Sequence, residues 1–392
     1  MSDIYLSRQP LVNHQSRVMA IRLSLHAVGK PTAREAVNTL TPLLENWLYG
    51  KRMVFIDYGS MPCCPDLFDW PIPENAMMEI PSSALIGPES AALVEQLKTL
   101  PISLVLVYDD DAEKAALTGI RFRFVNFDAK RYPPDQLKGL LIRTRDYGLG
   151  IAYNVYDAAS FQACVDVGIN AASSWFFKLP DKTKKAKALN PAQANIIRVL
   201  NLVRKNADIK EIEEALKQDV AISYKLLRYI NSVGFGLSCE VQSFRHAVTI
   251  LGYEKLNKWL SLLLVTASKA PMAQALMHTA LTRARLMELL ATDLFDPQEQ
   301  DNLFITGAFS LLDALLGVDM EQVLETMTLP SPICDALLGL EGIYAPFLNL
   351  TKTSEGEDGQ AIAEQAAMLG LTAQKFNIAQ MQALAFADKM DF

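Results

Sequence analysis

The sequence predicts two regions of different fold class: an N-terminal α/β region of (β/α) barrel type and a C-terminal all-helical region. Up to about Pro180, short runs of β-branched and aromatic residues alternate with stretches of helical periodicity. After Pro191 the strand signals stop and helical periodicity remains. The chain length of 392 residues also exceeds the usual size of one domain, about 100–200 residues.

Strands in the first region are expected at Met53–Asp57, Ile102–Tyr108, Arg121–Phe127 and Leu149–Val155. Helices between them are expected at Ala33–Tyr49, Glu89–Leu100, Pro134–Tyr147 and Ala158–Val167. Strands that are followed by helices imply parallel pairing through crossover helices. Because a complete eightfold barrel usually takes about 250 residues, a barrel in this region requires some crossover helices to be shortened or missing.

A lysine-rich stretch separates the two regions. It holds four lysines: Lys182, Lys184, Lys185 and Lys187. We interpret it as a solvated linker, and a basic contact for an acidic partner or nucleotide is the alternative. The expected domains are therefore 1–180 for the barrel, 181–190 for the linker and 191–392 for the helical domain.

The helical region carries recognisable helix boundaries. One helical face is marked by Ile196, Val199, Leu200 and Val203. Asp208, with Glu211 three residues later, predicts a capping box at the start of the next helix. A helix over Ala221–Asn231 is expected to end at the following glycines. Ser243 is expected to cap another helix, which is interrupted at Gly252.

Composition excludes several classes of protein. Half of the residues are hydrophobic and 21% are charged, as in ordinary globular proteins. The net charge of −7 argues against nucleic acid as the main partner, because phosphate binding needs a concentrated positive field. The longest apolar run, Trp259 to Ala267, is well below the roughly 18 residues of a membrane span.

The N-terminus and the cysteines indicate the cellular compartment. The first ten residues have neither the basic nor the apolar part of a signal peptide, so we expect a cytoplasmic protein. The five cysteines show no CxxC spacing, and we expect reduced thiols rather than a disulfide framework. They are Cys63, Cys64, Cys164, Cys239 and Cys334.

The first residues of the chain carry a family resemblance. Ser7-Arg8-Gln9-Pro10, followed by Ala20-Ile21-Arg22-Leu23, resembles the opening hairpin of EAL-type cyclic di-GMP phosphodiesterases. In that family the second strand carries Glu-x-Leu, and Arg22 stands where the family places a metal-binding glutamate. The resemblance implies a barrel in which carboxylates and an asparagine hold divalent cations at strand ends, while a lysine and another glutamate assist the attacking water.

Further positions can be compared with the same family. The resemblance places four retained acids at Glu79, Asp109, Asp110 and Asp128. It also places four replacements: Asp57 at the asparagine, Asn126 at the lysine, and Tyr153 and Tyr156 at two later glutamates. Ser173-Ser174 stands for a Gln-Gly pair. The comparison therefore predicts an acidic site that lacks several of its catalytic groups.

Arg22 decides what this site is expected to do. A positive charge among carboxylates repels a metal cation, and a guanidinium does not lose its proton, so we expect neither a metal nor a cofactor. In one interpretation Arg22 pairs with Glu79, Asp57 or Asp109 and closes the site. In the other, Arg22 and Gln9 bind a phosphate or guanine edge directly. The surviving acidity and the missing Gln-Gly pair favour the first.

Residues 221–260 resemble the HDOD signalling domain through Asn231-Ser232, Ser243, Ala247 and Leu251-Gly252. HDOD domains resemble HD phosphohydrolases, which need a His-Asp pair. Ser310-Leu311 stands at that pair here, and none of the four histidines precedes an aspartate; they are His14, His26, His246 and His278. The resemblance implies a groove near Asn231, Ser310 and Asp313 that binds no metal.

The order of the two domains resembles a family of bacterial two-domain signalling proteins. The resemblance and the missing ligands imply a catalytically inactive protein that binds other signalling proteins in cyclic di-GMP-related regulation of motility, biofilm or stress output. A non-hydrolytic cyclic di-GMP receptor is the first alternative. An active cyclic di-GMP phosphodiesterase is the second. Nucleic acid is not an expected partner, and no membrane span is expected.

Overall fold

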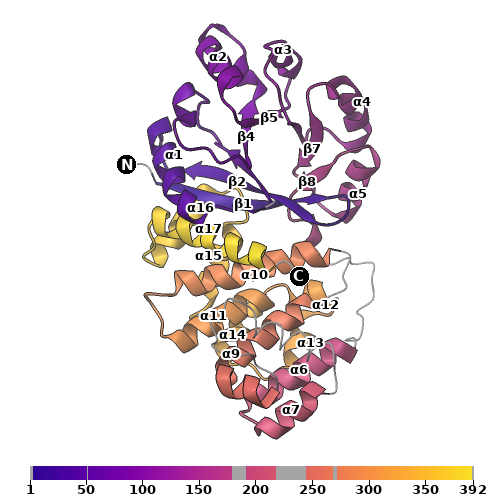
Figure 1. The fold of residues 1–392 in the computed structure, drawn as a ribbon, viewed down its shortest axis with the longest axis vertical. Helices are drawn as coiled ribbons and strands as arrows, with labels where there is room; N and C mark the ends of the chain where they lie inside the picture. The colour runs from indigo at the N-terminus through magenta and orange to yellow at the C-terminus, as the bar shows by residue number, and fades with distance from the viewer. Residues whose placement is uncertain (1–2, 51, 179–190, 218–243, 268–271, 391–392) are drawn as a thin grey trace. The chain divides into compact units, whose positions relative to one another are not determined.

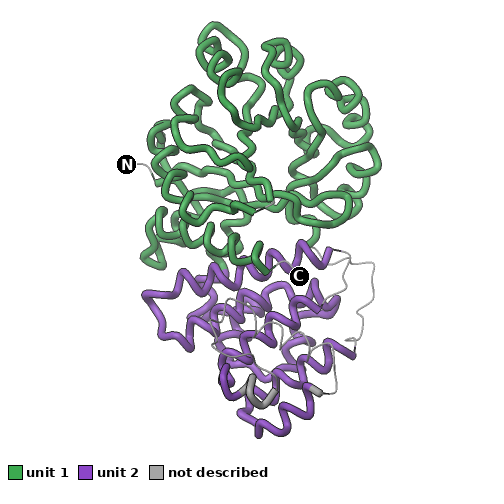
Figure 2. The backbone as a smooth tube through the Cα atoms, viewed as in Figure 1, with its two compact units in different colours: residues 1–179, 349–391 green, residues 180–348, 392 purple. Residues whose placement is uncertain are grey.

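The computed structural model describes residues 3–50, 52–178, 191–217, 244–267 and 272–390 of the chain. Two compact units are distinguished in it (Figure 2). The first comprises residues 1–179 and 349–391, and the second comprises residues 180–348 and residue 392. The chain therefore leaves the first unit and later returns to it.

The first unit is built on a closed barrel of eight strands (Figure 1). The strands are β1 (Ile4–Asn13), β2 (Val18–Ala27), β3 (Met53–Asp57), β4 (Ala76–Pro81), β5 (Ser103–Val107), β6 (Phe124–Asp128), β7 (Leu149–Tyr153) and β8 (Ala171–Ser173). β1 is antiparallel to both of its neighbours, β2 and β8, and all other neighbouring strands are parallel. The predicted barrel is confirmed.

Short connections explain how eight strands fit into this segment. The helical segments are α1 (Ala33–Leu40), η1 (Thr41–Asn46), η2 (Pro65–Phe68), η3 (Ser82–Leu85), η4 (Pro88–Ser90), α2 (Ala91–Thr99), α3 (Ala112–Ala116), α4 (Pro134–Thr144), α5 (Ala158–Asp166) and η5 (Phe176–Lys178). The β3–β4 connection contains the 3₁₀ helix η2, and β5 is joined to β6 by the five-residue α3. Crossover helices are shortened, as predicted.

The individual elements differ from the predictions in a few places. Strands β4 and β8 were not predicted, because β4 has the sequence AMMEIP without β-branched alternation and β8 has three residues. The single helix expected over Ala33–Tyr49 is α1 followed by the 3₁₀ helix η1, since Pro42 has no N–H group for an α-helical bond.

The barrel interior changes character along the strands. Alternate residues of a barrel strand face inward. One interior layer is apolar and consists of Leu11, Ala20, Phe55, Met77, Val105, Phe124, Ile151 and Ala171. Two residues further along the barrel stand polar side chains: Gln9, Arg22, Asp57, Glu79, Asn126, Tyr153 and Ser173. The polar layer lies toward the carboxyl ends of the parallel strands, where barrel proteins carry their sites.

The C-terminal helices belong to the barrel unit. α16 (Gly359–Met368) packs against β1 and β2, and α17 (Ala373–Lys389) packs against β1 and η1 (Figure 1). Met381 and Leu384 join the core between the strands and the outer helices. The expected helical domain over 191–392 is therefore wrong in its last part. The physical reason is that β1 and β2 are joined by a hairpin, which supplies no crossover helix to cover their outer face.

The described part of the second unit is helical, as predicted. Its helices are α6 (Pro191–Arg204), α7 (Ile209–Lys217), α9 (Phe244–Thr266), α10 (Ala273–Leu290), α11 (Pro297–Phe309), α12 (Leu312–Leu316), α13 (Met320–Glu325) and α14 (Ser331–Leu337). α15 (Ala345–Thr353) crosses the boundary between the units. α10 packs against α11, and α9 packs against α6 and α11.

Two predicted helix boundaries are present in this unit. The Asp208 carboxylate accepts a hydrogen bond from the backbone N–H of Lys210 at 2.8 Å, at the start of α7. Gly252 interrupts α9 with φ 71° and ψ 170°. The expected linker at 181–190 and the expected helix over Ala221–Asn231 lie outside the described residues. No helix among the described residues has the length and apolarity needed to cross a membrane.

Candidate functional site

Arg22 lies inside the barrel in a polar group with Asp57, Glu79, Asn126 and Tyr153, which we call the Arg22 cluster. Arg22 Nε donates to Glu79 Oε1 at 2.8 Å and Nη2 donates to Glu79 Oε2 at 2.9 Å. Nη2 also donates to Asp57 Oδ2 at 2.8 Å. A guanidinium that binds both oxygens of a carboxylate makes a strong, planar interaction. The ion pair expected between Arg22 and Glu79 or Asp57 is therefore present.

Two neutral side chains complete the Arg22 cluster. Asn126 Nδ2 donates to Glu79 Oε1 at 3.3 Å. The guanidinium carbon of Arg22 lies 5.3 Å from the centre of the Tyr153 ring, which is a cation–π distance. Asn126 and Tyr153 stand at positions where the EAL resemblance would place a lysine and a glutamate. Both replacements therefore support the Arg22–Glu79 pair.

Burial and pairing set the ionisation of the cluster. Burial alone would lower the pKa of Arg22, but the carboxylates of Glu79 and Asp57 outweigh it and raise that pKa. Burial likewise opposes ionisation of Asp57, but Arg22 and hydrogen bonds from Gly59 and Ser24 bring its pKa below the ordinary value. Burial raises the pKa of Glu79, and Arg22 opposes this shift. Arg22 therefore stays charged and Asp57 stays ionised at neutral pH.

These residues do not fit the divalent cation of an EAL-type site. Mg²⁺ needs carboxylate oxygens that are free to coordinate it. Arg22 occupies both oxygens of Glu79 and one oxygen of Asp57, and it adds a positive charge at the same place. Within the part of the chain that the structure describes, no group of three or more His, Cys, Asp or Glu side chains has the arrangement of a metal site.

Three of the other predicted residues lie apart from the Arg22 cluster. Asp109 Oδ1 accepts from the backbone N–H of Asp111 at 2.8 Å, in the turn before α3. Asp110 pairs with Arg131 at 2.8 Å and its side chain is 86% exposed. Tyr156 is 56% exposed. Asp109 was one of the three partners considered for Arg22, and its carboxylate instead stabilises this turn.

Asp128 and Gln9 lie beside the cluster. Asp128 Oδ1 accepts from Lys130 N at 2.9 Å and from Asn154 Nδ2 at 3.0 Å, and its charge contributes to raising the pKa of Tyr153 after the larger effect of burial. Gln9 Oε1 accepts from Ser173 Oγ at 3.0 Å. A nucleotide that bound to Gln9 Oε1 would compete with the Ser173 hydroxyl for it.

The rim of the cluster contains residues that the sequence did not indicate. Glu357 Oε1 lies 3.8 Å from Arg22 Nη1 and brings a third carboxylate to the guanidinium. His26 Nε2 lies 2.7 Å from Ser7 Oγ, and burial lowers the pKa of His26. Glu357 is far from Arg22 in sequence and lies in no recognisable motif, so only the fold brings the two together.

In the second unit, the predicted groove residues can be placed in part. Ser310 Oγ donates to the Gly307 carbonyl at 2.7 Å and accepts from Arg283 Nη1 at 2.9 Å. Arg283 is 3% exposed and was not predicted, although it interrupts the apolar sequence of α10. Asp313 lies in the first turn of α12, where a negative charge is favourable. Asn231 lies outside the described residues.

Comparison with known proteins finds a domain match within the second unit. Residues 189–318 match the model of the HDOD domain. The chain is 29% identical over 221 residues to "Cyclic di-GMP phosphodiesterase CdgJ" of Vibrio cholerae serotype O1. This match covers 56% of this chain and 51% of that protein. It thus spans about half the length of that relative. It is 24% identical over 391 residues to "Uncharacterized protein YuxH" of Bacillus subtilis strain 168, covering 92% and 93% of the two chains.

Among solved structures, the chain is similar to the FimX EAL domain of Pseudomonas aeruginosa bound to c-di-GMP, with 15% identity and a TM-score of 0.34. That similarity covers 45% of this chain and 89% of the other. The HDOD match ends at residue 318, before the helices that fold with the barrel. The chain thus has a closed eight-stranded barrel followed by a region that matches the HDOD domain.

Proposed function

We propose that this chain is a non-hydrolytic signalling protein in cyclic di-GMP-related regulation and that it acts by binding other signalling proteins. The observation that carries the proposal is the position of the Arg22 guanidinium, which binds Glu79 twice and Asp57 once. Hydrolysis of a phosphodiester by a metal enzyme needs a bound cation that lowers the pKa of the attacking water. Arg22 replaces that cation with a fixed side-chain charge.

The other replacements support the same conclusion. Tyr153 and Tyr156 have no carboxylate to orient or deprotonate a water, and Asn126 cannot supply the charge of a lysine. In the second unit, the Ser310 hydroxyl is held by Arg283 and by the Gly307 carbonyl. A serine bound in this way is a poor substitute for the metal-binding histidine of an HD enzyme.

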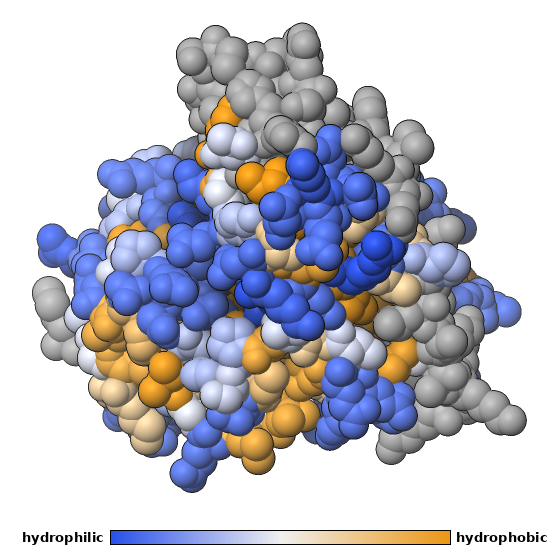
Figure 3. Space-filling model, turned by 90° about the horizontal axis from the view of Figure 1, so that it is seen from below, coloured by the Kyte–Doolittle hydropathy of each residue, from blue (hydrophilic) through white to orange (hydrophobic). Residues whose placement is uncertain are grey.

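Binding of other proteins is the activity that this proposal assigns to the chain. The face of the molecule drawn in Figure 3 has several groups of apolar side chains separated by polar ones. In the described part of the second unit, four large apolar side chains are 39–54% exposed: Leu294, Leu338, Leu340 and Ile343. Mixed apolar and polar surfaces of this kind are typical of non-obligate protein interfaces.

Turnover of cyclic di-GMP is the first test. The full chain is incubated with the nucleotide and Mg²⁺, and separately with Mn²⁺, beside an active EAL phosphodiesterase as the positive control. We expect no linear dinucleotide from this chain with either metal. The relative from Vibrio cholerae is named a phosphodiesterase, so this assay separates the two proteins directly. Product formation that requires the metal would overturn the proposal.

A neutralised cluster provides the second test. The variant Arg22→Met/Asp57→Asn/Glu79→Gln removes all three charges with little change in volume, and replacing a complete buried ion pair in this way is often tolerated. We expect a strain that carries the variant to keep the wild-type signalling output. Loss of output from a folded variant would show that the charges perform chemistry or bind a nucleotide. Calorimetry of the wild type with cyclic di-GMP, with and without Mg²⁺, separates those two explanations.

A further inference from the structure

The barrel has a seam beside its first strand. β8 pairs with β1 at three positions, Leu11, Val12 and Asn13. In the described residues, the N-terminal half of β1 extends beyond β8 on this side. The backbone groups along an uncovered strand edge need other partners, because an unpaired buried N–H or carbonyl group is costly.

Residues 349–389, which we call the returning segment, supply these partners. Leu6 N–H donates to Asn377 Oδ1 at 2.9 Å, and Asn377 Nδ2 donates to the Ile4 carbonyl at 2.8 Å. Gln380 Nε2 donates to the Leu6 carbonyl at 2.9 Å. Arg8 N–H donates to the Ser354 carbonyl at 3.0 Å. The returning segment therefore satisfies the edge of β1 as a neighbouring strand would.

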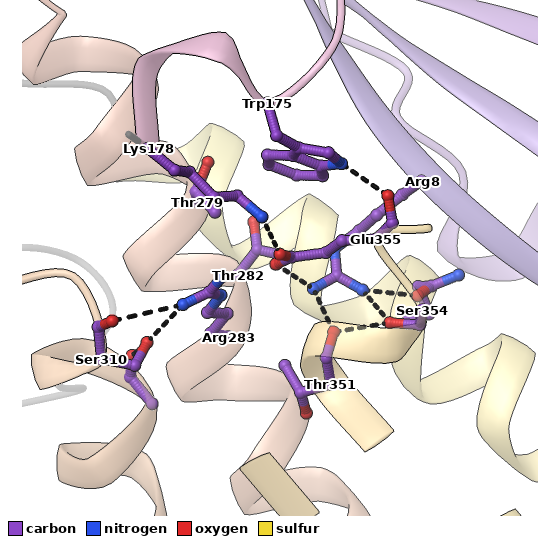
Figure 4. A network of polar contacts seen from close by, with 12 residues as sticks. Arg8, Trp175, Lys178, Thr279, Thr282, Arg283, Ser310, Thr351, Ser354 and Glu355 are labelled. Atoms are coloured by element: carbon purple, nitrogen blue, oxygen red, sulfur yellow. Dashed lines mark hydrogen bonds and ion pairs between the residues drawn. The ribbon is translucent and has the colours of Figure 1, made fainter. Parts of the chain in front are cut away.

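A buried group of charges fixes the returning segment at the seam (Figure 4). Arg8 Nη2 donates to Glu355 Oε1 at 3.1 Å, and both residues are 2% exposed. Lys178 Nζ donates to the other oxygen of Glu355 and lies 3.6 Å from the centre of the Trp175 ring. Trp175 Nε1 donates to the backbone carbonyl of Glu355. We call Arg8, Lys178 and Glu355 the clasp.

The clasp lies at both ends of the chain segment that forms the second unit. Lys178 stands shortly before the residue where that unit begins, and Glu355 stands shortly after the residue where it ends. One carboxylate therefore binds the outgoing chain through Lys178 and the first strand through Arg8. Residues from the chain on both sides of the inserted unit, Lys178 and Glu355, therefore meet in one buried group of charges.

The clasp is also adjacent to the Arg22 cluster. Gln9 follows Arg8 in β1 and is the register partner of Arg22 in β2. Glu357, two residues after Glu355, lies 3.8 Å from Arg22 Nη1. Gly359 approaches His26 so closely that a Cβ atom on it would lie 2.4 Å from His26 Cβ. A displacement of residues 354–359 would therefore uncover the rim of the Arg22 cluster.

We propose that the clasp couples the inserted helical unit to the barrel site. The closed clasp completes the barrel. When the helical unit pulls the clasp open, the edge of β1 and the rim of the Arg22 cluster become exposed. A buried ion pair suits such a device, because a broken pair leaves charges unpaired and partly opened states are unfavourable. In this proposal the element has a closed and an open state, and both units bias the balance between them.

Hydrogen exchange of the full chain with Glu355→Gln tests the closed state. We expect exchange of the Leu6 and Arg8 amides to rise about tenfold, because their acceptors lie in the returning segment. The Tyr108 amide, which bonds to the Asn126 carbonyl between β5 and β6, should not change. Glu113→Gln is the matched control, since Glu113 pairs with Arg143 at the surface, where its side chain is 62% exposed.

The same variant tests access to the Arg22 cluster. A dicarbonyl reagent modifies exposed guanidinium groups, and the Arg22 side chain is 8% exposed in the closed state. We expect mass spectrometry to show faster modification of Arg22 in Glu355→Gln and no change in the Glu113→Gln control. If Glu355→Gln raises the exchange rates of all amides by the same factor, or leaves the modification rate of Arg22 unchanged, the ion pair is merely structural and the proposal is overturned.

Coupling to the second unit needs a perturbation inside that unit. Leu260 in α9 is 0% exposed, and Leu260→Ala weakens the helical core; Leu294→Ala, at a residue 52% exposed, is the control. We expect exchange of the Arg8 amide to rise about threefold in Leu260→Ala, with Tyr108 unchanged. If the exchange rate of the Arg8 amide does not change in Leu260→Ala, even when the helical unit melts, the clasp does not respond to that unit and the coupling is overturned.

If Glu355→Gln does not fold, Lys178→Gln is used in its place, because this variant keeps the Arg8–Glu355 bond.

Discussion

Two buried arginine–glutamate pairs lie in the barrel unit, and they differ in the origin of their partners. Arg22 binds carboxylates from neighbouring strands of the same barrel, on β3 and β4. Arg8 binds Glu355, which is 347 positions away in the sequence. The first pair lies in the polar layer of the barrel interior, and the second joins two distant parts of one chain. Similar chemistry therefore serves two purposes in one barrel.

Breaking the Arg22 pair is expected to have the largest effect on stability. Glu79→Ala leaves a buried guanidinium without its bidentate partner and should lower the free energy of unfolding by about 3–5 kcal/mol. Urea unfolding followed by circular dichroism measures the change. Glu113→Ala removes one member of the exposed pair with Arg143 and should change it by about 0–1 kcal/mol. Equal effects of the two substitutions would mean that the Arg22 pair is open to solvent.

On the seam side, Asn377→Ala should have the next largest effect. Asn377 is 1% exposed and bonds two backbone groups of β1. Removing its side chain leaves those groups unpaired, and we expect a loss of about 1–3 kcal/mol in the same urea experiment. Gln374→Ala, at an exposed position of the same helix, is the matched control. A loss of unfolding free energy in Gln374→Ala but not in Asn377→Ala would contradict the role of the returning segment at the β1 edge.

The approach of Gly359 to His26 can be tested by adding one methyl group. Gly359→Ala places a Cβ atom 2.4 Å from His26 Cβ, so the start of α16 must shift. We expect destabilisation of about 1–3 kcal/mol in thermal unfolding. Gly342→Ala is the control, because its added Cβ would lie 3.7 Å from Asp335 Cβ, an ordinary contact. Equal stabilities of Gly359→Ala and Gly342→Ala would mean that residues 356–359 can move away from the rim of the Arg22 cluster without loss of stability.

The smallest expected effect concerns pH. The pKa of Asp57 in the folded state lies below its ordinary value of 3.8, so the ionised carboxylate stabilises the fold above that pH. This contribution is lost as the pH falls through the lowered pKa. We expect wild type to exceed Asp57→Asn in stability near neutral pH and the difference to shrink below about pH 4. The midpoints of urea unfolding of the two proteins, measured across this pH range, check this prediction. A stability difference that grows as the pH falls would contradict a lowered pKa for Asp57.

The sequence predicted the Arg22 cluster better than the seam for a physical reason. The resemblance to EAL-type phosphodiesterases assigned Arg22, Asp57 and Glu79 to strand ends of a barrel, and strand ends converge at one edge, so these residues could be expected to meet. Asp109 and Asp110 failed this expectation because β5 ends at Val107 and the chain turns before they occur. The side-chain partners of Arg8 include Ser354 and Glu355, in the turn after α15, and Gln380 on α17. Neither the turn nor the periodicity of the helices around it carries a local signal that this part of the chain returns to the barrel.

The domain boundary was misplaced for a related reason. Helical periodicity reports that a segment is amphipathic, and it does not report which core the apolar face joins. Phe376 packs its ring 6.1 Å from Tyr5, at the opposite end of the sequence. The uncovered hairpin of β1 and β2 was the available signal, since a strand pair joined by a tight turn must take its cover from elsewhere in the chain.

The returning segment also constrains how the protein can be made. During synthesis the first strands emerge from the ribosome early, and the helices that cover them, α16 and α17, are translated long after them. Until then the edge of β1 and the outer face of the hairpin remain open to pairing with other chains. A nascent chain in which α16 and α17 have not yet been made would therefore be exposed to chaperones and to other chains along this edge.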